Sequence, residues 1–242
     1  MCVALGYMKK NLWCVVVLLA MASPSLAQDK KGYIGISLGP SIPLGDLASK
    51  DIDNESAGFA TSGAIFDISV AYKLGKGPFG ITAMLRGQAN PMDAQAFVDG
   101  IANQNPGIYW TVESEGWSAG GWMLGGFGSF SISPKASFEP RAMIGFVNAV
   151  SPNITITGSA NGSSIWVKQG TASAFTFSYL LGAGFKFDLG QKFYLLTNLD
   201  YLGSNPEFSN IDITASDGSR SKSTLSQPMG TLNWGLGVAL KI

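Results

Sequence analysis

Bulky apolar residues alternate with small or polar residues along the last twelve positions of the chain. The apolar members are Leu232, Trp234, Leu236, Val238, Leu240 and Ile242. A repeat of two predicts a β-strand, because successive side chains of a strand point to opposite faces. The same alternation recurs at 60–74 and 175–187, and less regularly at 116–130. Several strands therefore have one bulky apolar face and one small or polar face.

Four strand ends are evenly spaced along the sequence. They are Leu74, Phe130, Phe187 and Ile242, which lie 56, 57 and 55 residues apart. Three of them follow a lysine that has a bulky residue on each side, and Ser129 takes the place of that lysine at the fourth. After each of the first three ends comes a short polar turn and a strand that opens with phenylalanine. We therefore predict four units, each with an upward strand, a long loop and a downward strand, at 33–74, 79–130, 138–187 and 193–242.

The connections between these strands alternate in length. Short turns are predicted at 75–78, 131–137 and 188–192, and long loops at 44–59, 90–115, 150–172 and 204–228. This pattern is typical of transmembrane barrels, whose apolar residues face lipid and whose other residues line the interior. We predict an all-β fold: an eight-stranded antiparallel up-and-down transmembrane β-barrel with short periplasmic turns and long extracellular loops. A soluble sandwich or lipocalin-like barrel is the alternative, but it would expose apolar patches that are rare on monomers.

An aromatic girdle is predicted near the periplasmic side of this barrel. Its members are Phe79, Phe130, Phe138, Phe187 and Phe193, which stand at the strand ends that border the short turns. Aromatic girdles mark the membrane–water interfaces of transmembrane barrels.

The first 27 residues have the pattern of a cleaved secretory signal peptide. Lys9 and Lys10 precede a short apolar stretch, and Ser25-Leu26-Ala27 fits the small-x-small cleavage pattern. We therefore expect cleavage after Ala27, a barrel domain at 28–242, and a location in the outer membrane of a Gram-negative bacterium.

The composition excludes several classes of chemistry. The chain has no histidine, and Cys2 and Cys14, its two cysteines, both lie within the predicted signal peptide. The mature protein therefore has neither imidazole nor thiol for catalysis or metal binding, and we predict no cofactor and no metal. Sixteen basic residues balance sixteen acidic ones, so nothing favours a nucleic-acid partner.

Two stretches resemble small outer-membrane β-barrel proteins of the Bacteroidota type. One is the opening Gly32-Tyr33-Ile34-Gly35-Ile36-Ser37-Leu38-Gly39-Pro40-Ser41-Ile42-Pro43-Leu44-Gly45. The other runs from Phe193 to Phe208 and includes Asp200-Tyr201 and Asn205-Pro206-Glu207-Phe208. Along nearly all of its mature length the chain is similar to the OmpA/OmpX-like class of eight-stranded barrels. The resemblance implies a fold, a location and insertion by the outer-membrane assembly machinery, but no single activity. Many such barrels end in phenylalanine, whereas this chain ends in Ile242.

The interior of an eight-stranded barrel is just wide enough for side chains to fill it. Buried charges must then pair. In the hairpin that places Leu74 opposite Phe79, Asp67 faces Arg86, so we predict an interior salt bridge with Asp200 as a second partner of Arg86. Glu139 and Arg141 share the inward face lower down. We interpret these five residues as a structural polar plug; the alternatives are a proton or ion path and a catalytic carboxylate.

The first two loops are acidic, and the last two have strand patterns. Asp51-x-Asp53-x-Glu55 has the early spacing of a calcium loop, but Ser56 and Ser62 stand where an EF-hand needs glycine and glutamate. We therefore interpret it as a solvated acidic loop. In the third loop, 154–157 and 165–167 predict a hairpin, and 211–214 before Asp217-Gly218 predicts another. Protruding strands leave edges that can pair with another chain.

These features predict a non-enzymatic outer-membrane barrel with a structural or surface-binding, adhesion-type role. The alternatives are a narrow pore for small solutes and a lipid-modifying outer-membrane enzyme; for the enzyme, a histidine-based triad is impossible. The expected partners are outer-membrane lipid and lipopolysaccharide, the assembly machinery, and a surface protein at loops 150–172 and 204–228. We expect a monomer.

Overall fold

The computed structural model describes residues 31–242. The predicted signal peptide at 1–27 and its cleavage site lie outside this range. Within it, the antiparallel strands that form the barrel are β1 (Gly32–Leu44), β2 (Gly63–Lys73), β3 (Phe79–Asn90), β5 (Trp117–Gly128), β7 (Ala136–Val150), β10 (Ser173–Asp188), β11 (Phe193–Ser204) and β14 (Met229–Lys241).

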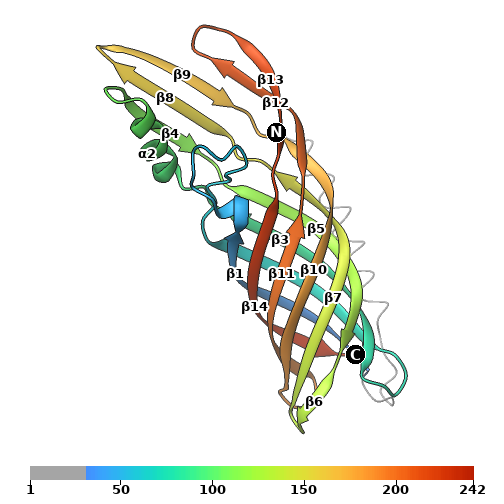
Figure 1. The fold of residues 1–242 in the computed structure, drawn as a ribbon. Helices are drawn as coiled ribbons and strands as arrows, with labels where there is room; N and C mark the ends of the chain where they lie inside the picture. Colours follow the sequence, from blue (N-terminus) through green and yellow to red (C-terminus); the bar gives the residue numbers. More distant parts are fainter. Residues whose placement is uncertain (1–30) are drawn as a thin grey trace, which may run out of the picture.

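The barrel is closed. Each strand pairs with its chain neighbours, β14 returns to β1, and the pairing of β7 with β10 completes the circuit (Figure 1). The fold is therefore the predicted eight-stranded antiparallel barrel. Closure leaves none of these strands with an unpaired edge inside the membrane, where an unsatisfied backbone group is costly.

The alternation of the sequence determines which side chains face outward. Along β14, Trp234 is 51% exposed on the outer face, whereas the adjacent Asn233 is completely buried inside. The same arrangement holds on β2, where Phe66, Val70 and Tyr72 point outward and Asp67 is buried. A soluble barrel would have the opposite arrangement, so the outer surface is a lipid-facing belt.

One predicted turn is wrong. The spacing predicts a turn at 131–137, but strand β6 (Phe130–Ser133) continues beyond β5 and pairs with β7, so the chain reverses only at Pro134 and Lys135. The alternation in fact continues: Phe130 and Ile132 are exposed, and the serines between and after them occupy the other face. Serine is common in turns, but it is also a small residue that suits the inward face of a barrel strand.

The outer loops form a second sheet. It contains β4 (Tyr109–Ser114), β8 (Ile154–Ala160), β9 (Ser163–Gln169), β12 (Glu207–Ala215) and β13 (Arg220–Ser226), in the order β13-β12-β9-β8-β4. The predicted hairpins of the third and fourth loops are present as β8–β9 and β12–β13. The sequence did not predict β4, helix α2 (Ala94–Gln104) or the pairing of β9 with β12 that joins the hairpins. Figure 1 shows this sheet standing beyond the outer end of the barrel.

Short joints connect the outer sheet to the barrel. Each joint is two or three residues long. Residues 151–153 link β7 to β8, 170–172 link β9 to β10, 205–206 link β11 to β12, and 227–228 link β13 to β14. Three of them contain proline, whose ring fixes the backbone φ angle. The joints also bond in pairs: the Ser151 amide donates to the Ala172 carbonyl at 2.9 Å, and the Gln227 amide donates to the Pro206 carbonyl at 3.1 Å. These short, hydrogen-bonded joints therefore restrict movement of the outer sheet relative to the barrel.

Apolar side chains close the outer mouth beneath this sheet. The short helix η1 (Gly45–Ala48) folds inward and buries Leu47 completely, and Trp117 and Phe208 pack in the same cluster. The Trp117 indole donates a hydrogen bond of 2.7 Å to the Gly58 carbonyl, which fixes the first loop over the mouth. In the part of the chain that the structure describes, no helix is long and apolar enough to cross a membrane.

Candidate functional site

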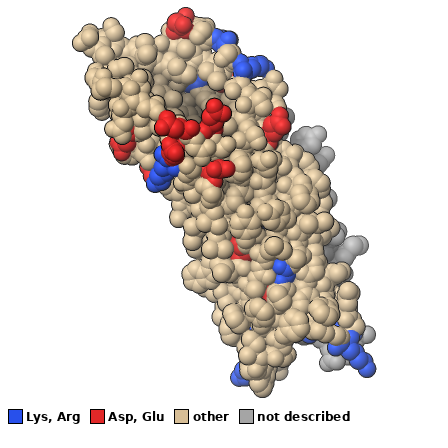
Figure 2. Space-filling view, viewed as in Figure 1, with Lys and Arg blue, Asp and Glu red and all other residues tan. Residues whose placement is uncertain are grey.

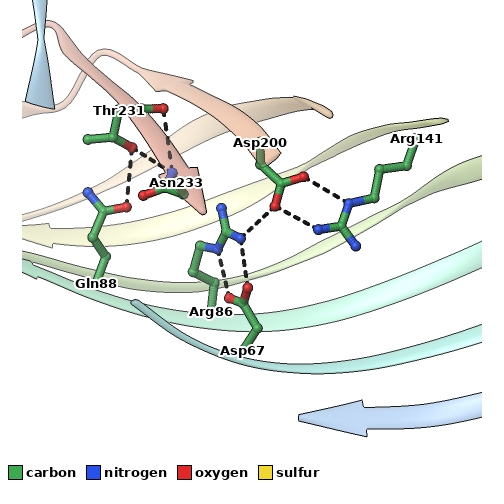
Figure 3. A network of polar contacts seen from close by, with 7 residues as sticks. All are labelled: Asp67, Arg86, Gln88, Arg141, Asp200, Thr231 and Asn233. Carbon is green, nitrogen blue, oxygen red and sulfur yellow. Dashed lines mark hydrogen bonds and ion pairs between the residues drawn. The ribbon is translucent and has the colours of Figure 1, made fainter. Parts of the chain in front are cut away.

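Four charged side chains form a chain of ion pairs across the lumen (Figure 3). Arg86 donates from Nε and Nη2 to the two carboxylate oxygens of Asp67, both at 2.7 Å. The same Nη2 donates to Asp200 at 2.9 Å. Arg141 donates to both oxygens of Asp200, at 2.9 and 2.6 Å. Bidentate arginine–carboxylate pairs are stronger than hydrogen bonds between neutral groups, and they fix the relative orientation of the two side chains.

The network of four ion-paired side chains carries no net charge. Asp67 and Asp200 oppose Arg86 and Arg141, and each of the four side chains is at most 8% exposed. A buried charge is tolerated when it is paired and hydrogen-bonded. Both carboxylates are held by guanidinium groups, so neither is a free base in this arrangement. The structure thus brings together four of the five predicted lumen residues.

The fifth, Glu139, faces inward but has other partners. Lys186 forms an ion pair with one of its oxygens, and the Tyr33 hydroxyl donates to the other at 2.9 Å. The sequence placed Glu139 and Arg141 on one face without naming their partners. Lys186 lies on β10, which pairs with the β7 strand of Glu139, and Tyr33 lies on β1 across the lumen. The alternation places both side chains on the inward face.

Neutral polar side chains extend the plug toward the outer end. Thr231 donates to Gln88 at 3.3 Å, and Asn233 donates to the Thr231 hydroxyl at 3.0 Å (Figure 3). Gln88 in turn donates to Asn90 at 3.0 Å. The predicted lumen residues were all charged and did not include this layer. Its members could have been found from the alternation, because they occupy the same inward-facing positions of their strands as Asp67 and Arg86.

One backbone position makes room for the ion network. A Cβ atom on Gly182 would lie 2.0 Å from Oδ1 of Asp200, far inside van der Waals contact. Glycine is therefore required at this point of β10, because the Asp200 carboxylate fills the space that a side chain would need. Gly182 pairs with both Asp200 and Arg141 in the sheet.

The predicted aromatic girdle divides into two groups. Phe79, Phe130 and Phe193 are exposed on the outside, with the rings of Phe79 and Phe130 edge to face at 6.2 Å. Phe138 and Phe187 are half-buried and pack around Phe185.

Acidic side chains gather around a hollow at the outer end (Figure 2). The predicted calcium pattern adopts a turn in which the Asp53 amide donates to the Asp51 carboxylate, and Gln104 donates to Asp53 at 2.8 Å. Within residues 31–242, no three acidic side chains converge as a metal site requires. Asp93 caps α2 and pairs with Lys50; this hydrogen bond and the Ala96 amide hold the pKa of Asp93 below its usual range.

The outer sheet has an apolar face and an open edge. The strand register aligns Val112, Ile156, Val167 and Ala215 in one row across four strands. Ile165 is 60% and Val167 42% exposed on this face. Helix α2 packs against the β4 edge, whereas β13 pairs only with β12 among the described strands.

No protein-family model matches the chain, and no curated protein matches its sequence. Several solved outer-membrane proteins are similar in structure. A major outer membrane protein from Thermus thermophilus is 12% identical with a TM-score of 0.49, covering 87% of this chain and 99% of its own. Neisserial surface protein A (NspA) is 9% identical with a TM-score of 0.45, covering 87% and 97%. The attachment invasion locus protein Ail of Yersinia pestis is 12% identical with a TM-score of 0.43, covering 89% and 100%. The likeness concerns the fold alone.

Proposed function

We propose that this protein is a non-enzymatic outer-membrane barrel that binds a partner through the sheet standing outside the membrane. The observation that carries the proposal is the exposed apolar pair Ile165 and Val167 on β9, in a sheet whose edge strand β13 pairs only with β12 among the described strands. An exposed apolar strip and an unpaired strand edge are the two features by which a sheet recruits another chain.

The outer surface of the barrel supports a location in the outer membrane. Closed walls, a lipid-facing apolar belt and exposed phenylalanines at one rim suit a bilayer. Transmembrane barrels of this kind occur in outer membranes, and the predicted signal peptide agrees with export.

The lumen supports a scaffold role better than transport or catalysis. The ion network and the polar layer above it fill the middle, and the cluster around Leu47 closes the outer mouth. A filled lumen predicts no discrete current steps in planar-bilayer recording. Regular single-channel openings would instead favour the narrow pore.

Photo-crosslinking on intact cells tests the binding surface. A photoreactive amino acid at Ile165 or Val167 is expected to form a defined protein adduct, because both side chains are exposed on one face of the outer sheet. Tyr109 is the matched control, because it is exposed on the opposite face of the same sheet. The register places Trp110, Gly158 and Ile165 in one row and so on one face, and Tyr109, one residue before Trp110, points to the other face. Adducts at 165 and 167 but not at 109 support the proposal. No protein adduct, or the same adducts at all three positions, would contradict it.

A further inference from the structure

The inner end of the barrel contains a cavity lined by lysine and serine side chains. Its volume is about 170 Å³, and its walls include Lys31, Lys73, Lys135 and Lys186 together with Ser131 and Ser133. One water needs roughly 10–15 Å³ of such space. The cavity therefore has room for a solvated ion, and it lies at the opposite end of the protein from the proposed binding sheet.

The overhang of β6 and β7 forms one wall of this cavity. Beyond the end of β5, β6 pairs only with β7 among the described strands, so this hairpin projects past the rest of the rim. Phe130 and Ile132 point outward, which places Ser131 and Ser133 on the inner side, where both line the cavity. The Ser133 hydroxyl also accepts a hydrogen bond of 3.3 Å from the Lys135 backbone amide. Lys73 contributes from the end of β2.

The charge of the lining is unbalanced. Glu139 is paired with Lys186. Asp188, the one carboxylate in the lining, is hydrogen-bonded to Lys241 at 2.6 Å, and Lys135 acts on it only through a weaker, longer-range attraction. Within residues 31–242, neither Lys73 nor Lys135 has an ion-pair partner. Ammonium groups that share one concave site repel each other, and an anion between them removes this repulsion.

We propose that the inner-end cavity binds a phosphate group. Phosphate oxygens are strong hydrogen-bond acceptors, and Lys73, Lys135, Ser131 and Ser133 supply donors from two walls. The group can come from two sources: free phosphate in the periplasm, or the headgroup of a phospholipid at the rim. The exposed Phe79, Phe130 and Ile132 place an apolar surface for acyl chains beside the cavity.

The test removes the two unpaired ammonium groups with little change in the length of the side chains. Wild type and the double variant Lys73→Gln/Lys135→Gln are compared in maltoside micelles, which contain no phosphate. One arm titrates inorganic phosphate by calorimetry, and the other measures retention of phosphatidylglycerol by native mass spectrometry. We expect the double variant to bind the phosphate group roughly 30-fold more weakly in the arm that shows binding. Each lysine near an anionic group contributes about a fivefold gain in affinity, and the variant loses two of them.

The matched control is Lys76→Gln/Lys192→Gln, which removes the same charge from turns that do not line the cavity. Its affinity is expected to stay within about twofold of wild type, and equal unfolding midpoints show that both variants fold. Saturable binding of phosphate assigns the free anion, and retention of phosphatidylglycerol alone assigns the headgroup. Absence of both in wild type, or an equal loss in both variants, would overturn the proposal.

Discussion

The two ends of the barrel differ in both charge and construction. The outer loops hold eleven acidic and four basic residues and fold into a sheet, a helix and an apolar cap. The inner end holds seven lysines, two acidic residues and short turns; the lysines are Lys31, Lys73, Lys76, Lys135, Lys186, Lys192 and Lys241. Between the ends lies the neutral network around Arg86 and Asp200. An excess of negative charge at the outer end and of positive charge at the inner end are thus separated along the barrel axis by a middle with no net charge.

The largest effect is expected where the balanced middle is broken. Asp200→Asn removes the carboxylate that Arg86 and Arg141 share, and Arg141 keeps no charged partner. Loss of one member of a buried charge pair costs about 3–5 kcal/mol of unfolding free energy. Urea unfolding in lipid vesicles, followed by tryptophan fluorescence, measures it. Asp200→Asn/Arg141→Leu restores neutrality and should recover most of the loss; a loss below about 1 kcal/mol in the single variant would contradict the pairing.

A smaller effect is expected from crowding the same network. Gly182→Ala places a methyl group against Asp200 and should destabilise the barrel by about 1–3 kcal/mol, as overpacking does. Gly87→Ala is the control, because no atom lies within 4 Å of its added Cβ. The same unfolding assay applies, and equal stabilities of the two variants would show that the middle tolerates displacement.

At the acidic outer end the effect should be local. Asp93→Ala removes the cap of α2 and the pair with Lys50, with a cost of about 1 kcal/mol. The lowered pKa of Asp93 means that its contribution is present above the unfolded pKa and is lost as the pH falls through the lower folded value. Protection of the α2 amides from hydrogen exchange, measured against their intrinsic exchange rates at each pH, should therefore fall in the variant at neutral pH, and in the wild type only in acid.

The smallest effect is expected at the basic inner rim. Lys76 is an exposed turn residue without an ion-pair partner in the described chain. Lys76→Gln should change the unfolding free energy by less than about 0.5 kcal/mol. A larger stabilisation would show that repulsion among the inner lysines reaches beyond the cavity.

The sequence predicted what depends on local spacing. A period of two determined which residues face inward, and a tight turn placed Asp67 opposite Arg86. The contact of Glu139 with Lys186 joins the paired strands β7 and β10, whose register is set by a long loop and not by a tight turn. The contacts of Arg141 with Asp200 and of Glu139 with Tyr33 cross the lumen between strands that are not paired, so they depend on strand stagger and on the width of the barrel. The outer hairpins were predictable from their own residues for the same local reason. Their joining through β9 and β12, and the addition of β4, required knowing where each loop emerges from the barrel.

The short joints beneath the outer sheet have a mechanical consequence. A partner that pulls on the sheet loads β8, β9, β12 and β13, and two or three residues pass that load to each of four barrel strands. Force along an antiparallel ladder is shared by many hydrogen bonds at once. The barrel would therefore resist extraction as one body, and tension would be transmitted to the membrane without first unravelling a flexible tether.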